Sequence, residues 1–187
     1  LNLLGEVERV NGNLSRPASS GENSENAAKV VDRTASSLLN QAMRIVEQHL
    51  PDDHFLWLSV KINLGRLEAS KGIYQAALDH FDAAIERAKS QPGTANESYI
   101  SALLNKGLLF KSLLRFKEAI TYCERALAMR QQFVDENHPD LLPHYVALGS
   151  LYISKRDPDA LRDQVRKSAG IIQQHWGAAI ARGERPP

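Results

Sequence analysis

The side chains able to bind metal ions or to act as nucleophiles are few in this chain of 187 residues, which has six histidines and one cysteine. The densest group is HLPDDH, from His49 to His54, where two imidazoles and two carboxylates lie within one turn. These groups could hold a metal ion, or they could form a polar turn that caps a helix. The spacing favours the polar turn, because it does not match the usual ligand spacing of zinc sites.

No other motif in the sequence indicates catalysis. There is no phosphate-binding loop, nucleophile elbow or metalloprotease motif, and the dispersed carboxylates form no pair suited to acid–base chemistry. Cys123 occupies an apolar position of a helical pattern, so we expect a buried side chain rather than a reactive thiol. Trp57 and Trp176 are expected to pack in a core. We therefore expect that the protein is not an enzyme and that it uses no metal ion or other cofactor.

The composition is that of a globular protein. Hydrophobic residues make up 43% and charged residues 24%, which excludes wholesale disorder. The formal net charge is +1, so there is no electrostatic case for a nucleic-acid or membrane-surface partner. No apolar stretch is long enough to span a membrane. The single cysteine excludes a disulfide within the chain and, with no recognisable signal peptide, favours a cytoplasmic location.

An internal repeat organises the sequence. Gly65, Gly107 and Gly149 recur at intervals of 42 residues, and such a period is typical of stacked repeats. Small and apolar residues follow the first two glycines at matching offsets, a half-unit precedes them, and the third unit matches less well. The matching residues are Ala77, Phe81 and Ala84 in unit one, Ala119, Cys123 and Ala126 in unit two, Leu161, Val165 and Ser168 in unit three, and Ala35, Leu39 and Ala42 in the half-unit.

Each unit predicts a pair of antiparallel helices, because its apolar residues are spaced at three and four positions and do not alternate as in a strand. The recurring glycines and alanines would let paired helices approach closely. First helices are expected over about 54–70, 96–112 and 139–155, and the second helix of unit one over 74–90. The predicted N-terminal caps are Asp53, then Thr94 with Glu97, then Asn137 with Pro139.

These residues resemble the tetratricopeptide repeat. The segment from Leu64 to Ala88 follows the order of the family signature, and the signature aromatic of the first helix is matched by Phe110 and Tyr152 but replaced by Glu68. The period of 42 residues, longer than the usual 34, is similar to that of kinesin light chains. Pro158 and Leu161 depart from the signature, which places the packing of the third unit's second helix in question.

The resemblance implies an all-α chain that forms a right-handed α-solenoid of antiparallel helix hairpins. It would comprise about three repeats, a half repeat and a terminal capping helix. We expect the repeat domain over 27–181, a short amphipathic helix over Leu1–Val10 with a linker up to residue 26, and an irregular tail over 182–187.

The resemblance also implies that first helices line a concave groove that binds a peptide or a segment of a partner protein. Arg66 and Lys111 could attract an acidic group of that partner. The wider set of groove positions includes Ile62, Val146, Ala147 and Ile153. The residues expected to carry binding are Asn63, Arg66, Ser70, Asn105, Leu108, Lys111, Ser112 and Ser150.

An alternative function is that of a self-associating or regulatory segment within a larger multidomain protein. The segment from Ser168 to Ala181 has an apolar face made of Ile171, Ile172, Trp176 and Ile180. This face could cap the array from within, or it could join two copies of the chain into a homo-oligomer.

Overall fold

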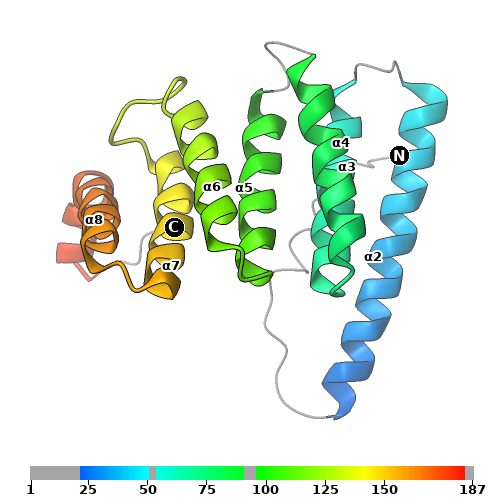
Figure 1. Cartoon of the computed structure of the whole chain (residues 1–187), viewed down its shortest axis with the longest axis horizontal. Coiled ribbons are helices and arrows are strands. Elements are labelled where there is room, and N and C mark those ends of the chain that lie inside the picture. Colours follow the sequence, from blue (N-terminus) through cyan, green and yellow to red (C-terminus); the bar gives the residue numbers. More distant parts are fainter. Residues whose placement is uncertain (1–21, 51–53, 91–95, 184–187) are drawn as a thin grey trace. The chain divides into compact units, whose positions relative to one another are not determined.

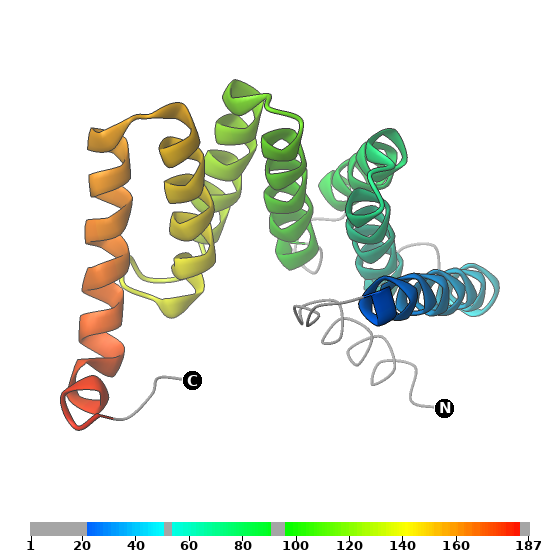
Figure 2. The same ribbon diagram turned by 90° about the horizontal axis from the view of Figure 1, so that it is seen from below.

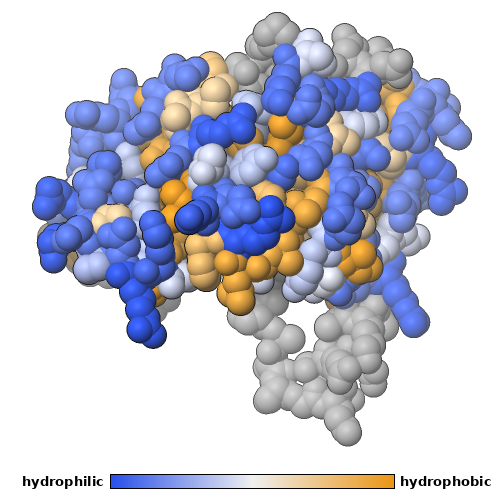
Figure 3. All heavy atoms as spheres, viewed as in Figure 1, coloured by the Kyte–Doolittle hydropathy of each residue, from blue (hydrophilic) through white to orange (hydrophobic). Residues whose placement is uncertain are grey.

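The computed structural model describes residues 22–50, 54–90 and 96–183, and within these ranges it contains seven α-helices, one short 3-10 helix and no strand (Figure 1). The all-α fold class predicted from the sequence is confirmed. The chain divides into two compact units, Leu1–Ser98 and Tyr99–Pro187. On the face shown in Figure 3, polar side chains alternate with smaller apolar areas. None of the helices in the described ranges combines the length and apolar character needed to cross a membrane.

The described residues of unit 1 contain three helices, of which α3 packs against both α2 and α4 (Figure 1). Ala35, Leu39 and Ala42, the residues of the predicted half-unit, are buried in the core between α2 and α3. Trp57 lies half-buried against this core, with the guanidinium of Arg87 4.1 Å from its ring centroid. The helices are α2 (Glu22–His49), α3 (Phe55–Ser70) and α4 (Tyr74–Lys89).

Unit 2 contains two hairpins, and Figure 2 shows the second of them as two helices side by side. Its last core is built from Leu141, Tyr145 and Ile171, with Trp176 packed against them. Of the four residues of the predicted apolar face, Ile171 is therefore buried in this core, and Trp176 is partly buried against it. The elements are α5 (Asn96–Ser112), α6 (Phe116–Arg130), η1 (Pro139–Leu141), α7 (Leu142–Lys155) and α8 (Pro158–Ala181).

The backbone repeats with the predicted period. Gly72, Leu114 and Arg156, which are 42 residues apart, all have a positive φ, at 78°, 60° and 57°. In each turn the amide of the following residue donates to a carbonyl five residues back, at the same N–O distance of 2.9 Å. This hydrogen bond closes the first helix of each hairpin and turns the chain into the second.

The recurring glycines are sites of close helix approach in the first two hairpins. A Cβ added at Gly65 would lie 2.6 Å from the ring of Phe81, and one at Gly107 would lie 2.6 Å from the sulfur of Cys123. Cβ atoms essentially never come this close to other atoms, so a side chain at either position would force its neighbours to shift. At Gly149 the nearest atom would be the Leu161 side chain at 3.6 Å, an ordinary contact distance.

Helix α8 is turned about its axis relative to the second helices of the other hairpins. Val165, at the position of Phe81 and Cys123, is 56% exposed, whereas those two residues are buried. The buried residues of α8 are instead Gln164 and Ile171, each one residue earlier than the repeat pattern predicts. One residue corresponds to about 100° of rotation. Leu161, which is larger than Ala77 and Ala119 at the same repeat position, lies beside Gly149, with its side chain 3.6 Å from where a Cβ on that glycine would be.

Histidines cap two of the helices. The Nδ1 atom of His54 accepts a hydrogen bond from the amide of Leu56 at the start of α3, whereas the predicted cap, Asp53, lies outside the described residues. The Nδ1 atom of His138 accepts in the same way from Asp140 and begins η1, so Asn137 is not the cap. An imidazole nitrogen can therefore take the place of the usual Ser or Asp oxygen.

Several helix boundaries differ from those predicted, and two predictions fall on residues that are not described. Helix α2 begins at Glu22, within the stretch predicted as a linker. Pro139 begins the short 3-10 helix, and α7 begins only at Leu142. The predicted helix over Leu1–Val10 and the Thr94 cap lie outside the described residues. The segment from Ser168 to Ala181 is the second half of α8 and not a separate helix.

Candidate functional site

The surface that fits the predicted groove within unit 2 is made by α5 and α7, the first helices of its two hairpins. Val146 and Ile153 on α7 are 64% and 63% exposed, and Leu108 on α5 is 37% exposed. Ser150 lies between Val146 and Ile153 on α7, and Lys111 follows Leu108 by three residues on α5. We call these five residues the α5–α7 face.

The two helices of this face are joined by a hydrogen bond. The ammonium of Lys111 donates to the hydroxyl oxygen of Ser150 at 2.9 Å, and Ser150 in turn donates to the backbone carbonyl of Ala147 at 2.7 Å. Spacings of three and four residues place Leu108 on the same side of α5 as Lys111, and Val146 and Ile153 on the same side of α7 as Ser150. The structure thus brings the predicted Lys111 and Ser150 into direct contact.

Polar side chains along the face bond to their own helices. Asn105 donates from its amide to the carbonyl of Ser101 at 2.8 Å, and Ser112 donates to the carbonyl of Leu108 at 3.3 Å. These bonds hold the side chains in place along α5. A hydroxyl or amide oxygen held in this way can also accept a hydrogen bond from a peptide N–H.

The charge of the two helices is one-sided. Helix α7 has no acidic residue, and α5 has only Glu97, in its first turn. Their basic side chains include Lys111 at the centre of the α5–α7 face and Lys155 in the last turn of α7. The local field therefore favours a ligand that carries a carboxylate.

The predicted residues of unit 1 form a row on α3. Asn63, Arg66 and Ser70 are spaced by three and four residues, and Ser70 is exposed. Ser70 donates to the carbonyl of Leu67 at 2.7 Å. The predicted site residues are thus divided between the units, with three on α3 and five on α5 and α7.

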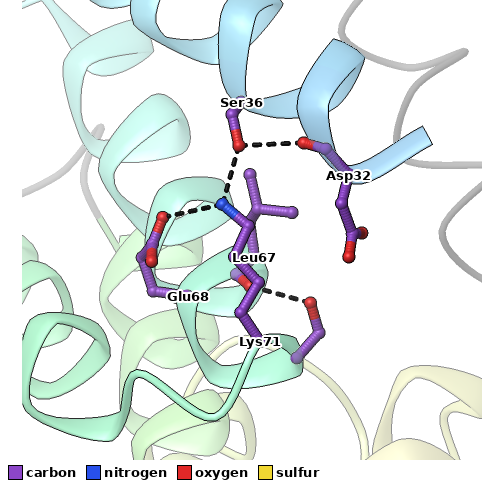
Figure 4. A network of polar contacts seen from close by, with 6 residues as sticks. Asp32, Ser36, Leu67, Glu68 and Lys71 are labelled. Carbon is purple, nitrogen blue, oxygen red and sulfur yellow. Dashed lines mark hydrogen bonds and ion pairs between the residues drawn. The ribbon is translucent and has the colours of Figure 1, made fainter. Parts of the chain in front are cut away.

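Close to this row, a polar network ties α3 to α2 (Figure 4). The ammonium of Lys71 donates to Ser36 at 2.7 Å and pairs with Glu68 at 3.1 Å, while Ser36 donates to the carbonyl of Asp32 at 2.8 Å. Glu68 stands where the other repeats have an aromatic residue. A surface ion pair with a hydrogen bond here replaces aromatic packing.

The repeat position of Glu68 holds a different residue in each hairpin, with Phe110 in the second and Tyr152 in the third. In unit 2, Phe110 stacks on Tyr122 with centroids 5.4 Å apart, whereas Tyr152 donates its hydroxyl to Glu124 at 3.2 Å. Burial, with the Glu124 carboxylate beside it, raises the pKa of Tyr152 to about 12. These contacts join helices within the array and are structural.

Two predicted groove positions are not available to a ligand. Ile62 and Ala147 are both buried, so they belong to the helix packing and not to a binding surface. Conversely, Val146 and Ile153 are the most exposed apolar residues of the face. The family resemblance placed them among the groove positions, but their exposure could be read only from the structure.

Nothing in the described ranges gathers three or more histidine, cysteine or carboxylate side chains in a way that could hold a metal ion. Cys123 is buried, as predicted, and burial raises the pKa of its thiol to about 12. Its sulfur is therefore protonated at neutral pH and poorly nucleophilic.

The hairpins, their constant period and their close-packed glycines define a helical-repeat protein. Residues 98–168 match the tetratricopeptide repeat family, so the resemblance predicted from the sequence is confirmed for this part of the chain. No curated protein matches the chain.

Solved structures of similar fold include BtubC (BKLC) from P. vanneervenii, with a TM-score of 0.68 and 23% identity over 76% of this chain and 56% of that one. The chain thus spans little more than half the length of BtubC. Two crystal structures of the nearly identical TPR-like repeats of a putative kinesin light chain from Podosopora anserina have TM-scores of 0.63 and 0.61 at 15% identity. They cover 92% of this chain and 87% and 88% of theirs.

Proposed function

We propose that the protein is a non-catalytic interaction module that binds a peptide segment of a partner protein along its first helices, with the α5–α7 face as the main contact. Tetratricopeptide repeats generally mediate contacts between proteins. The observation that carries the proposal is the exposure of Val146 and Ile153 on either side of the bonded pair of Lys111 and Ser150.

The chemistry of the face describes its ligand. Burying a valine or isoleucine side chain contributes about 1.5–3 kcal/mol, so apolar side chains of the peptide would cover Val146 and Ile153. An acidic group would approach Lys111, since no acidic side chain of α7 competes for it. The row of Asn63, Arg66 and Ser70 on α3 belongs to unit 1 and is a separate, more polar surface.

The test is a selection of random peptides displayed on phage against the immobilised chain, followed by affinity measurements with two variants. Val146→Glu places a charge on the α5–α7 face, and Val165→Glu places the same charge at a comparably exposed site on α8. We expect selected peptides to lose at least about tenfold in affinity for the first variant, the effect of 1.4 kcal/mol, and to bind the second as they bind the unaltered chain. Equal binding to both variants, or no enriched peptide, would overturn the proposal.

A second candidate function is self-association of the chain or docking within a larger protein. The favouring observation is that Val165, Ile172 and Ile180 remain exposed on α8, although Ile171 is buried and Trp176 is partly buried against the core. Light scattering of the chain over a concentration series separates this candidate from a strictly monomeric peptide binder.

The single cysteine also supports a cytoplasmic location. The balanced charge of the sequence supports a partner that is neither a nucleic acid nor a membrane. Fractionation of cells that express the tagged chain tests the location directly, and recovery of the chain with membranes or in a secreted fraction would contradict it.

A further inference from the structure

The rotation of α8 exposes apolar side chains that the other hairpins bury. In α4 and α6, the residues equivalent to Val165 lie in the core, but Val165 itself is 56% exposed. Ala169 and Ile172, four and seven residues further on, are also exposed. These three residues lie on one side of α8, with the half-buried Leu161 and Trp176 extending the row at either end. We call this row the α8 stripe.

The α8 stripe is symmetric about its own middle. Reversing the helix about the point between Ser168 and Ala169 places Val165 where Ile172 was, and Leu161 where Trp176 was. Each large apolar residue is therefore opposed by another large one when two copies of α8 lie antiparallel, and the small Ser168 and Ala169 meet at the centre. Small residues at a crossing point let two helices approach to about 8–10 Å.

The charges of α8 agree with the antiparallel arrangement. All its acidic residues, arginines and lysines lie between Asp159 and Lys167, and none follows Ser168. Within one copy they already pair, Arg162 with Asp159 at 3.0 Å and Lys167 with Asp163 at 2.7 Å. An antiparallel partner sets this charged half against the uncharged half, whereas a parallel partner would set like charges together.

From these features we infer that the occupant of the α8 stripe is a second copy of the chain, bound antiparallel about a two-fold axis between Ser168 and Ala169. Such an interface uses the same surface on both subunits. It is independent of the α5–α7 face, so one can fail without the other. A single helix pair buries little area, and the dimer is therefore weak and dependent on concentration.

The first test measures the mass of the full chain by sedimentation over a wide concentration range. The unaltered chain should shift from one towards two copies as concentration rises, and Val165→Glu should raise the dissociation constant at least about tenfold, the effect of 1.4 kcal/mol. Val146→Glu, with the same change on the α5–α7 face, should dimerise normally. A chain that stays monomeric throughout, or a dimer that Val165→Glu leaves unchanged, would overturn the inference.

The direction of pairing is tested by a charge exchange. In the double variant Val165→Lys with Ile172→Glu, an antiparallel dimer brings the new lysine of one copy beside the new glutamate of the other, so association returns. Parallel pairing brings like charges together, and the variant would then stay monomeric. Failure of the double variant to associate, with its circular dichroism and melting unchanged, would overturn the antiparallel geometry.

Cross-linking locates the axis. A cysteine introduced by Ala169→Cys lies next to the two-fold and should form an intermolecular disulfide under mild oxidation, because the two Cα atoms can come within the roughly 4.4–6.8 Å that a disulfide needs. Gln174→Cys introduces an exposed thiol on another side of α8 and serves as the control. Equal yields from both variants would contradict the proposed axis.

Discussion

The sulfur of Cys123 on α6 lies 2.6 Å from the point where a Cβ on Gly107 of α5 would be. In unit 1 the ring of Phe81 bears the same relation to Gly65, at the same 2.6 Å. A thiol and a phenyl ring thus fill one position of the repeat against one glycine. In these two hairpins the second helix is held at a distance that a side chain at the glycine position would increase.

Replacing these glycines by alanine should therefore destabilise the protein. At Gly107 the added methyl would also meet the carbonyl oxygen of Ala119 at 3.1 Å, which is backbone and cannot turn aside. We expect Gly65→Ala and Gly107→Ala each to lower the free energy of unfolding by about 1–3 kcal/mol, the usual cost of overpacking. Urea denaturation followed by circular dichroism measures this.

The matched control is Gly149→Ala, where the new methyl meets Leu161 at 3.6 Å and Gln164 at 3.9 Å, both ordinary contact distances. Alanine is favoured over glycine in a helix by about 1 kcal/mol, so this variant should be as stable as the unaltered chain or more so. Equal destabilisation at all three positions would show that the third hairpin packs like the other two.

The three left-handed residues make a second prediction. Glycine adopts a positive φ without cost, but Leu114, at φ 60°, does so against its side chain, a strain of about 1–2 kcal/mol. Leu114→Gly should raise the free energy of unfolding by up to about 1 kcal/mol, because the greater flexibility of the unfolded glycine chain offsets part of the gain. Gly72→Ala should lower it by about 1 kcal/mol. Thermal melting measures both variants. Opposite changes in stability would show that the sign of φ matters, whereas a loss of stability in both would mean that any substitution in the turn is harmful.

Much of the fold follows from spacing alone. Three glycines at one interval, with alanines at fixed offsets, predicted the hairpins, their order and the helix starts at 96 and 74. The caps were harder to predict, because a histidine is not a preferred N-cap and only its local geometry lets Nδ1 reach the second amide. The rotation of α8 depends on how one leucine fits against α7, and sequence periodicity carries no information on that fit beyond marking Leu161 as different.

His80 should make stability depend on pH. Burial and the nearby Lys61 ammonium hold the pKa of His80 below its usual 6.5, against the opposing effect of Glu68 and Asp79. A depressed folded-state pKa means that the unfolded chain binds the proton more readily, so stability is complete above about pH 6.5 and falls as the pH drops through the folded-state pKa. His80→Tyr, which copies the equivalent Tyr122, should remove this part of the slope. Equal slopes of unfolding free energy in both proteins would contradict it.

The thiol of Cys123 should be unreactive in the folded protein. Since burial raises the pKa of the thiol to about 12, almost no thiolate exists at pH 8. A thiol reagent such as dithionitrobenzoate should therefore react only as fast as the protein opens, and fully in denaturant. Rapid labelling under native conditions, with the helical signal unchanged, would contradict the packing of Cys123 against Gly107.

The candidate site was predicted less completely than the fold. Lys111 and Ser150 were singled out separately by their repeat positions, but their hydrogen bond joins two hairpins and depends on side-chain reach. The exposure of Val146 and Ile153 depends on which side of α7 its neighbours cover. The repeat identifies a helix face, and only the packing shows which of its residues meet solvent.

The central claim, that the α5–α7 face binds a peptide, is tested most directly by methyl NMR of the labelled chain titrated with a peptide selected on it. The account predicts saturable shifts concentrated at the methyl groups of Leu108, Val146 and Ile153, which disappear in Lys111→Glu when the peptide is acidic. Shifts concentrated instead at Val165 and Ile172, or no saturable shift at the three face residues, would contradict it.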